Sequence, residues 1–408
     1  MSKNLTNLFE KFLEKQSLFT NKKALQSIFI PDAIKHRDKQ IEQIAEILAP
    51  ALREEKPSNI FIYGKTGTGK TLSVRHTVDE MKRIAEEKDI RLKIIYVNCK
   101  LKKIADTEYR MIAELSRSFG KAVPPTGLPT DEVYNIFYHA VEEQNSIIIL
   151  VLDEIDQLIN RAGDEIIYNL TRINSDLKKS QLSLVGISND LMFANNIDPR
   201  VKSSLSEEEL VFPPYNAPQI RDILEERSKI AFKEDVIEEG VIAKCAAYAA
   251  REHGDARRAL ELLRVAGEIA ERNAEDHVQI KHIDFAEDKI EKDRIIDIVQ
   301  TQPKQFQNVL FPILVLKRNN PKEKIYTGDI YEIYKSLCIK TNIRPLTQRR
   351  ISDIISELDM LGIINAKIIS KGRFGRTKEI SLSLPSPVEK TVFTLLTTEL
   401  GVDATQLL

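Results

Sequence analysis

The sequence predicts three domains in order along the chain: an α/β domain with a mostly parallel sheet, a small all-helical domain and a mixed α+β module. Three observations support this division. Short apolar runs alternate with helical patterns in the first half, such runs stop after Pro213-Pro214, and the C-terminal part shows helices followed by two strands around a turn. At about 150 residues per domain, a chain of 408 residues holds two or three domains.

The α/β domain is predicted from strands that are apolar on both faces, as in a buried parallel sheet. Such strands are expected at residues 59–63, 93–98, 147–152 and 182–187, and helical patterns at 41–52 and 71–88. Strand, helix, strand at this rhythm is typical of a three-layer α/β fold. Residues 4–19 also show helical spacing, which fits either a helix packed on this chain or a segment that docks a partner.

The residues after 213 are predicted to form two smaller domains. Amphipathic helical patterns cover 220–232, 237–251, 256–273 and 282–292, and a charged stretch at 287–294 leads into the third module. Helices are expected there at 306–318, from 327 onward and at 347–361, followed by strands at 363–370 and 378–384 around a turn at 371–376. This order of elements is that of a winged helix. The expected domains are therefore 1–212, 213–292 and 293–408.

Composition excludes several classes of protein. Lys and Arg (60) balance Asp and Glu (61) to a net charge of −1, so no global field draws the chain to nucleic acid or membranes. The longest aliphatic run, 147–152, is far shorter than the roughly 20 residues of a membrane span, and the N-terminus lacks signal-peptide features. We therefore expect a cytoplasmic protein without a membrane partner. Three distant cysteines and six histidines without ligand spacing argue against a disulfide framework and a zinc site.

A glycine-rich stretch directly follows the first predicted strand and opens a helix. It matches the pattern G-x-x-x-x-G-K-[ST] and consists of Gly64, Lys65, Thr66, Gly67, Thr68, Gly69, Lys70 and Thr71. Glycines allow successive backbone N–H groups to turn inward around phosphate oxygens at the positive end of a helix. Lys70 is expected to reach the β- and γ-phosphates, and the Thr71 hydroxyl to complete the shell of a Mg²⁺ ion. The sequence therefore predicts a site for a nucleoside triphosphate.

A pair of acids ends the most apolar predicted strand. Asp153 and Glu154 follow residues 147–152, at the carboxyl edge of the sheet where ligands of open α/β folds bind. Asp153 is expected to hold Mg²⁺, and Glu154 to polarise the attacking water. An acidic helix N-cap is the alternative for this pair, and the phosphate loop favours the catalytic interpretation.

Further motifs resemble those of AAA+ ATPases. Asn189 follows a predicted strand, as the sensor-one residue does, and Arg257, in a Gly-Asp-Ala-Arg stretch, resembles the sensor-two arginine. Arg200 resembles the arginine finger supplied to a neighbouring subunit, and His36-Arg37 resembles the segment that closes over adenine. The resemblance implies that these residues act with the phosphate loop on ATP or ADP and Mg²⁺. Singly, the arginines and Asn189 also fit a surface or a helix cap, and it is their order along the chain that favours the ATPase.

The predicted winged helix concentrates positive charge. Residues 340–380 hold nine basic and four acidic residues, a local excess of five in a chain of net charge −1. The start of helix 347–361 corresponds to the end that reaches base edges in helix-turn-helix proteins, and the wing combines glycines, cations and an aromatic ring. The candidate DNA contacts are Thr347, Gln348, Arg349, Arg350, Lys371, Arg373, Phe374, Arg376 and Lys378. A solvated hairpin or a surface for a protein partner remains open as an alternative.

From about residue 36 onward, the chain resembles the archaeal replication initiator ATPases of the origin recognition complex and cell-division-cycle helicase-loader family. The likeness rests on the phosphate loop and on residues 152–156, 200–204, 254–260 and 371–380. It implies double-stranded origin DNA as a ligand, the replicative helicase and other initiator subunits as partners, and a nucleoid-associated location. We expect ATP hydrolysis to act as a conformational switch and to be slow, because Arg200 needs the site of a neighbouring subunit to act on. The resemblance also implies a DNA-contacting helical insertion, which we place within about residues 100–132. A branch-migration motor of the AAA+ class, and a signalling ATPase whose winged helix binds protein, stay open as alternatives.

Overall fold

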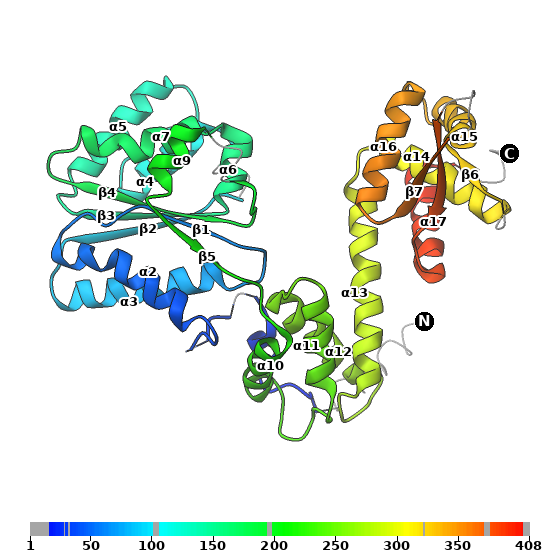
Figure 1. Ribbon diagram of the computed structural model, residues 1–408, viewed down its shortest axis with the longest axis horizontal. Coiled ribbons are helices and arrows are strands. Elements are labelled where there is room, and N and C mark those ends of the chain that lie inside the picture. The colour runs from blue at the N-terminus through cyan, green and yellow to red at the C-terminus, as the bar shows by residue number, and fades with distance from the viewer. Residues whose placement is uncertain are drawn as a thin grey trace, which may run out of the picture. The chain divides into compact units, whose positions relative to one another are not determined.

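The computed structural model describes residues 16–27, 29–31, 33–100, 106–193, 198–320, 323–370 and 376–402. The chain divides into two compact units, Met1–Ala286 and Glu287–Leu408 (Figure 1). The boundary falls within helix α13 (Ile280–Thr301). This continuous helix replaces the separate helix and charged linker that the sequence predicted between residues 282 and 302. The three domains expected at 1–212, 213–292 and 293–408 stay a prediction.

The first unit contains a five-stranded sheet in the order β2-β3-β4-β1-β5, with every neighbouring pair parallel. The strands are β1 (Ile60–Tyr63), β2 (Leu92–Asn98), β3 (Ile147–Asp153), β4 (Gln181–Ser188) and β5 (Glu208–Val211). The four strands predicted from the sequence are confirmed. The fifth strand, β5, was missed because it lies at the edge of the sheet. Only Leu210 is buried there, and the two glutamates interrupt the apolar pattern that marks a buried strand.

Two apolar layers enclose this sheet, because alternate residues of a strand point to opposite faces. In β3, Ile148 and Leu150 belong to one buried cluster, and Ile149 and Val151 to another. Figure 1 shows α2 and α3 on one side of the sheet and α4, α5, α6, α7 and α9 on the other. The helices are α2 (Asp38–Leu48), α3 (Lys70–Glu87), α4 (Glu108–Ser118), α5 (Thr130–Glu142), α6 (Ile155–Ala162), α7 (Glu165–Arg172) and α9 (Pro199–Leu205), with short 3-10 helices η2 (Ala49–Arg53) and η3 (Ile173–Ser175). The predicted three-layer α/β fold is confirmed.

Helix α4 lies where we placed the DNA-contacting insertion, at residues 100–132. It contributes Met111, Ile112 and Leu115 to the buried core, each without exposed surface. Tyr109 donates a hydrogen bond to the carbonyl of Pro124 in the loop that follows. The described part of this segment is therefore anchored to the core, residues 101–105 lie outside the described residues, and contact with DNA stays a prediction.

A helical region follows the sheet in the first unit. It consists of α10 (Ala217–Ala231), α11 (Val241–Arg251), α12 (Ala256–Arg272) and the start of α13. The second of these helices begins four residues later than predicted, because Ile237 forms a β-bridge with Val278. Residues ahead of the sheet pack here as well: Phe19 forms a bridge with Phe232, and η1 (Lys22–Leu25) contacts α10.

The N-terminal helix predicted at residues 4–19 falls largely outside the described residues. Its last part is described, and residues 16–19 are not helical, so the prediction is wrong there. The reason is tertiary: these residues form the bridge to Phe232, and the Thr20 N–H donates to the carbonyl of Ala231.

The second unit is a winged helix, as predicted. Its elements are α14 (Lys304–Asn319), β6 (Ile325–Tyr326), α15 (Thr327–Lys340), α16 (Gln348–Met360), β7 (Ile364–Ser370), β8 (Arg376–Leu382) and α17 (Ser386–Leu400). The antiparallel sheet has the order β6-β8-β7. The two-residue strand β6 and helix α17 were not predicted, and α17 closes the core with Val392 and Leu396, both without exposed surface. Within the described part of the chain, no helix is long and apolar enough to cross a membrane.

Candidate functional site: a nucleotide cavity and a basic helix end

A cavity of about 360 Å³ opens where the strands of the parallel sheet end and the helical region begins. The predicted site residues that line it are Gly67, Gly69, Thr71, Asp153, Glu154, Asn189 and Arg257. These residues come from four separate stretches of the chain, so the fold brings the phosphate loop, the acid pair and both sensor candidates to one place.

The phosphate loop joins β1 to α3, and two glycines make its turn possible. Gly67 and Gly69 have φ angles of +69° and +89°, which favour glycine. The Lys70 ammonium is 4% exposed and donates 2.7 Å hydrogen bonds to the carbonyls of Gly64 and Lys65, so it lies folded into the loop. Burial is the main cause that lowers the pKa of Lys70 to about 8, and the positive charge of Arg257 is the second. A bound phosphate would stabilise the charged form of this buried lysine.

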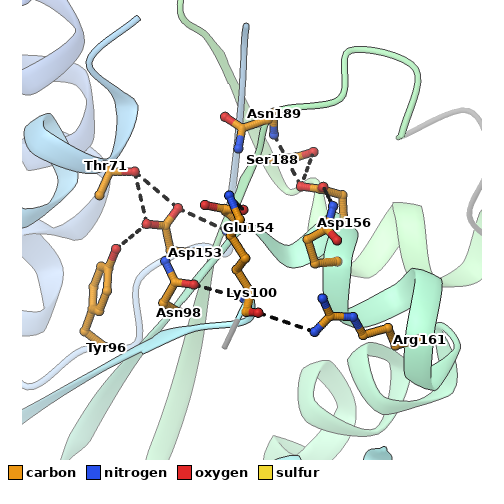
Figure 2. Close-up of polar contacts among 11 residues, drawn as sticks. Thr71, Tyr96, Asn98, Lys100, Asp153, Glu154, Asp156, Arg161, Ser188 and Asn189 are labelled. Atoms are coloured by element: carbon orange, nitrogen blue, oxygen red, sulfur yellow. Dashed lines mark hydrogen bonds and ion pairs between the residues drawn. The ribbon is translucent and has the colours of Figure 1, made fainter. Parts of the chain in front are cut away.

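The acid pair lies at the end of β3. Asp153 is 3% exposed and accepts hydrogen bonds from the Thr71 hydroxyl at 3.0 and 3.2 Å, from the Tyr96 hydroxyl and from the Glu154 N–H (Figure 2). Glu154 has a φ angle of 56°, unusual for a residue other than glycine. Its carboxylate faces Lys100, whose ammonium lies 3.7 Å away. The two acids therefore have different partners, as their predicted roles require.

The hydroxyl of Thr71 and the carboxylate of Asp153 fit a Mg²⁺ ion. Both present hard oxygen atoms at the cavity wall, and Mg²⁺ is typically bound through one or two carboxylates together with substrate phosphates and water. Among the described residues, no group of three or more His, Cys, Asp or Glu side chains forms a metal site. Thr71 and Asp153 would supply two of the ligands of the ion, and phosphate oxygens and water would supply the others.

Two residues that sequence reasoning missed hold this centre in place. Asp156, 6% exposed, accepts hydrogen bonds from the Ser188 hydroxyl at 3.1 Å and from the Asn189 N–H at 3.3 Å, which fixes the backbone of Asn189 (Figure 2). Tyr96 of β2 contacts Asp153 of β3, and the Arg75 guanidinium lies 4.2 Å from the centre of the Tyr96 ring. The parallel pairing of two adjacent predicted strands is the signal that would have brought Tyr96 near Asp153.

The structure does not bring His36 and Arg37 to the described cavity wall. The His36 Nε2 atom lies 2.9 Å from a carboxylate oxygen of Asp222. Arg37 is 2% exposed, donates through Nε to the Thr68 carbonyl at 2.8 Å and through Nη2 to the Pro213 carbonyl at 2.6 Å, and stacks on the Tyr215 ring at 3.8 Å. Arg37 thus supports the phosphate loop through the Thr68 carbonyl, on a side of the loop that does not line the cavity.

The remaining loop residues also lie off the described wall. Thr68 donates to the Lys65 carbonyl at 2.9 Å, and Thr66 is exposed. Arg200, on α9, has a 72% exposed side chain that pairs with Asp198 at 3.0 Å. Its predicted action on a neighbouring subunit stays a prediction.

The apolar residues that line the cavity were not predicted. They are Phe29, Ile30, Pro31, Ala33, Ile34, Leu72, Ile223 and Leu260. The first five come from an irregular segment without helix or strand periodicity, so no pattern in the sequence pointed to them. An apolar wall beside a phosphate loop suits the base of a nucleotide.

The DNA candidates of the second unit have different surroundings. Thr347 is the N-cap of α16, where its hydroxyl accepts from the Arg350 N–H at 3.4 Å. Gln348, Arg349 and Arg350 are exposed on the first turn of this helix. Lys378 points inward: its ammonium donates to the Ser352 carbonyl at 2.8 Å and to the Ser356 hydroxyl, and burial lowers its pKa. Lys371, Arg373 and Phe374 lie outside the described residues, and Arg376 begins β8.

Family models match three parts of the chain. An AAA domain model matches residues 53–191, the Cdc6 AAA+ ATPase-type lid domain matches residues 221–288, and the CDC6 C-terminal winged helix domain matches residues 297–389. These models name the same three kinds of domain that the sequence predicted.

Known proteins resemble the chain over nearly its whole length. The ORC1-type DNA replication protein 1 of Methanosarcina mazei is 51% identical over 97% of this chain and 94% of that protein, and the ORC1-type DNA replication protein of Pyrococcus furiosus is 52% identical over 94% and 91%. The solved structure of the Aeropyrum pernix ORC1 protein in complex with DNA is 44% identical, covers 94% of this chain and 98% of that one, and has a TM-score of 0.82. The chain therefore belongs to the ORC1-type DNA replication proteins, a family of AAA+ ATPases.

Proposed function

We propose that this protein is a replication initiator that binds double-stranded origin DNA under the control of ATP and helps to load the replicative helicase. The observation that carries the nucleotide part is the convergence of Thr71, Asp153, Glu154, Asn189 and Arg257 on one cavity. The Aeropyrum pernix ORC1 protein in complex with DNA, and the exposed basic start of α16, support the DNA part.

The cavity residues divide the work of binding and hydrolysing ATP. The N–H groups of the loop and Lys70 bind the phosphates, and the apolar wall receives the base. Thr71 and Asp153 would hold Mg²⁺, which neutralises charge on the phosphate oxygens. Glu154 accepts a proton from the attacking water, Asn189 orients this water, and Arg257 contacts the γ-phosphate.

Hydrolysis resets a switch in this scheme. Arg257 belongs to the helical region and the phosphate loop to the sheet, so a γ-phosphate between them ties the two together. Loss of that phosphate removes the tie. Turnover is slow because the arginine finger, Arg200, acts on the site of another initiator subunit.

The nucleotide assignment is tested by Lys70→Ala. Titration with a fluorescent ATP analogue should show binding by the wild type and none by the variant, because the variant lacks the cation of the loop. Lys88→Ala, at the end of α3 and away from the loop, is the control and should bind as the wild type does. Duplex binding by Lys70→Ala should be largely intact, and equal loss of both activities would contradict the division between the two units.

The DNA assignment is tested by Arg349→Ala and Arg350→Ala. Each should weaken duplex binding and lower the slope of log affinity against log salt by about 1 if the arginine contacts a phosphate. Lys335→Ala, whose ammonium pairs with Glu332, serves as the matched control in the same unit. A footprint on genomic DNA with and without ATP tests for a specific origin. An absence of salt-dependent duplex binding would favour the signalling ATPase.

A further inference from the structure

The helical region contacts the phosphate loop through the N-terminus of α12. The Ala256 N–H donates to the Gly67 carbonyl at 3.3 Å, and the Thr66 hydroxyl donates to the Asp255 carboxylate at 3.2 Å. Both bonds join residues almost two hundred positions apart in the sequence. The start of α12 is thus seated directly on the loop that is expected to hold the phosphates.

Two glycines allow this close approach. A side chain at Gly67 would place its Cβ atom 1.7 Å from Oδ1 of Asp255, and one at Gly254 would place it 2.3 Å from the carbonyl oxygen of Tyr215. Both glycines have positive φ angles, +69° and +70°. Asp255 can therefore lie against the loop only because there is no side chain at position 67 in the loop or at position 254 before α12.

Helix capping explains only half of the Asp255 side chain. Oδ1 accepts from the N–H groups of Arg257 and Arg258, at 2.8 and 3.2 Å, which is the usual work of an N-cap residue. Serine caps a helix about as well. The second oxygen, Oδ2, goes to Thr66 and satisfies no donor of the helix. A side chain with two acceptors is needed to cap α12 and reach the loop at once.

The contact also leaves the phosphate cradle intact. Phosphates are held by backbone N–H groups that turn inward. The bonds to α12 use instead a hydroxyl, that of Thr66, and a carbonyl, that of Gly67. The loop can therefore bind phosphate and α12 at the same time.

We propose that Asp255 is a latch: with Thr66 it holds α12, and hence Arg257 two residues further on, over the bound phosphates and slows the release of nucleotide. Asp255 is a positioning residue, because it acts through Arg257 and through the closed position of the helical region. The inference rests on the proposed function, since it requires that the cavity binds a nucleotide.

The test measures release of a fluorescent ADP analogue by stopped flow. Asp255→Ser keeps the cap but does not reach Thr66, and Thr66→Val removes the hydroxyl with little change of shape. Each should accelerate release about three- to tenfold, the effect of one lost hydrogen bond of ordinary strength at an exposed hydroxyl. Association should change less than about twofold. The double variant should release no faster than the single ones, because both remove the same bond.

Controls separate the latch from helix stability and from charge. Thr66→Ser keeps the hydroxyl and should release nucleotide more slowly than Thr66→Val. Asn216→Ser alters the N-cap of α10 without touching the loop and should release nucleotide at the wild-type rate. Removing the negative charge of Asp255 beside phosphates would by itself tighten binding, so faster release has the opposite sign to a charge effect. Thermal unfolding of the nucleotide-free variants should shift by the same small amount for Asp255→Ser and Thr66→Val, because both lose the same bond.

The proposal is overturned if Asp255→Ser releases nucleotide at the wild-type rate. It is equally overturned if Asp255→Ser is fast while Thr66→Val is not, because Asp255 would then act without the bond to Thr66. If the wild type binds no adenine nucleotide, it is the proposed function that fails. The two failures are therefore distinguishable in one set of measurements.

Discussion

Replacing Arg37 by alanine should destabilise the first unit strongly. The guanidinium donates hydrogen bonds to the carbonyls of Thr68, Pro213 and His36, at 2.8, 2.6 and 3.2 Å. Its central carbon lies 3.8 Å from the centre of the Tyr215 ring. A hydrogen bond from a charged group contributes about 1.5–3 kcal/mol, a buried cation–π contact about 1–2 kcal/mol, and such terms are not additive. We expect a loss of about 3 kcal/mol in the free energy of unfolding of the first unit.

The lysine variant sharpens this prediction. Arg37→Lys keeps the charge but replaces a planar fork by a single ammonium, which cannot serve the Thr68 and Pro213 carbonyls together, so about half of the loss should remain. Urea unfolding followed by circular dichroism measures both variants. Arg83→Ala, on the exposed surface of α3 with partners Glu80 and Glu87, is the control and should change stability by less than about 0.5 kcal/mol. A loss below about 1 kcal/mol for Arg37→Ala would refute the supporting role.

Three further predictions concern other parts of the first unit. Folding lowers the pKa of Lys70 from 10.5 to about 8, so between these pH values the unfolded chain binds more protons at Lys70 than the folded protein does. The free energy of unfolding of the wild type, relative to that of Lys70→Met, should therefore rise from pH 8 to 10.5. A flat or falling difference, measured by urea unfolding, contradicts this. Gly267→Ala would place a Cβ atom 2.5 Å from the Phe19 ring, and we expect thermal unfolding to show a net loss of about 1–2 kcal/mol that Phe19→Leu partly restores; an unchanged midpoint argues against close packing. Asp156→Ala frees the backbone of Asn189 and should lower ATP turnover about tenfold while nucleotide affinity stays within about twofold, and normal turnover would remove Asp156 from the site.

Local patterns were sufficient for the parts of the molecule that follow one rule along the chain. Residues 147–152 are apolar on both faces because both faces of this strand are covered, and Asp153 follows the apolar run at the carboxyl end of the strand. The glycines of the phosphate loop are needed for its backbone angles whatever surrounds it. The order of helices and strands likewise predicted the winged helix.

Other features depend on partners that are distant in sequence, and these were missed or misplaced. Arg37 was expected to close over the adenine of the nucleotide, yet its guanidinium donates hydrogen bonds to the carbonyls of Thr68 in the loop and of Pro213. Lys378 was expected to face DNA, yet it donates to α16, and its contact with DNA stays a prediction. Five of the eight apolar residues that line the cavity come from an irregular segment, which has no helix or strand periodicity.

The sequence by itself determined the three kinds of domain, the phosphate loop and the acid pair, because each is encoded by neighbouring residues and by their period. Only the tertiary structure decided which side chains surround the loop: Arg37 behind it, Asp156 beside Asn189, and Asp255 seated on Gly67. The physical reason is that hydrogen-bond donors and acceptors are paired across the folded chain, and the choice of partner depends on distances that no local pattern contains.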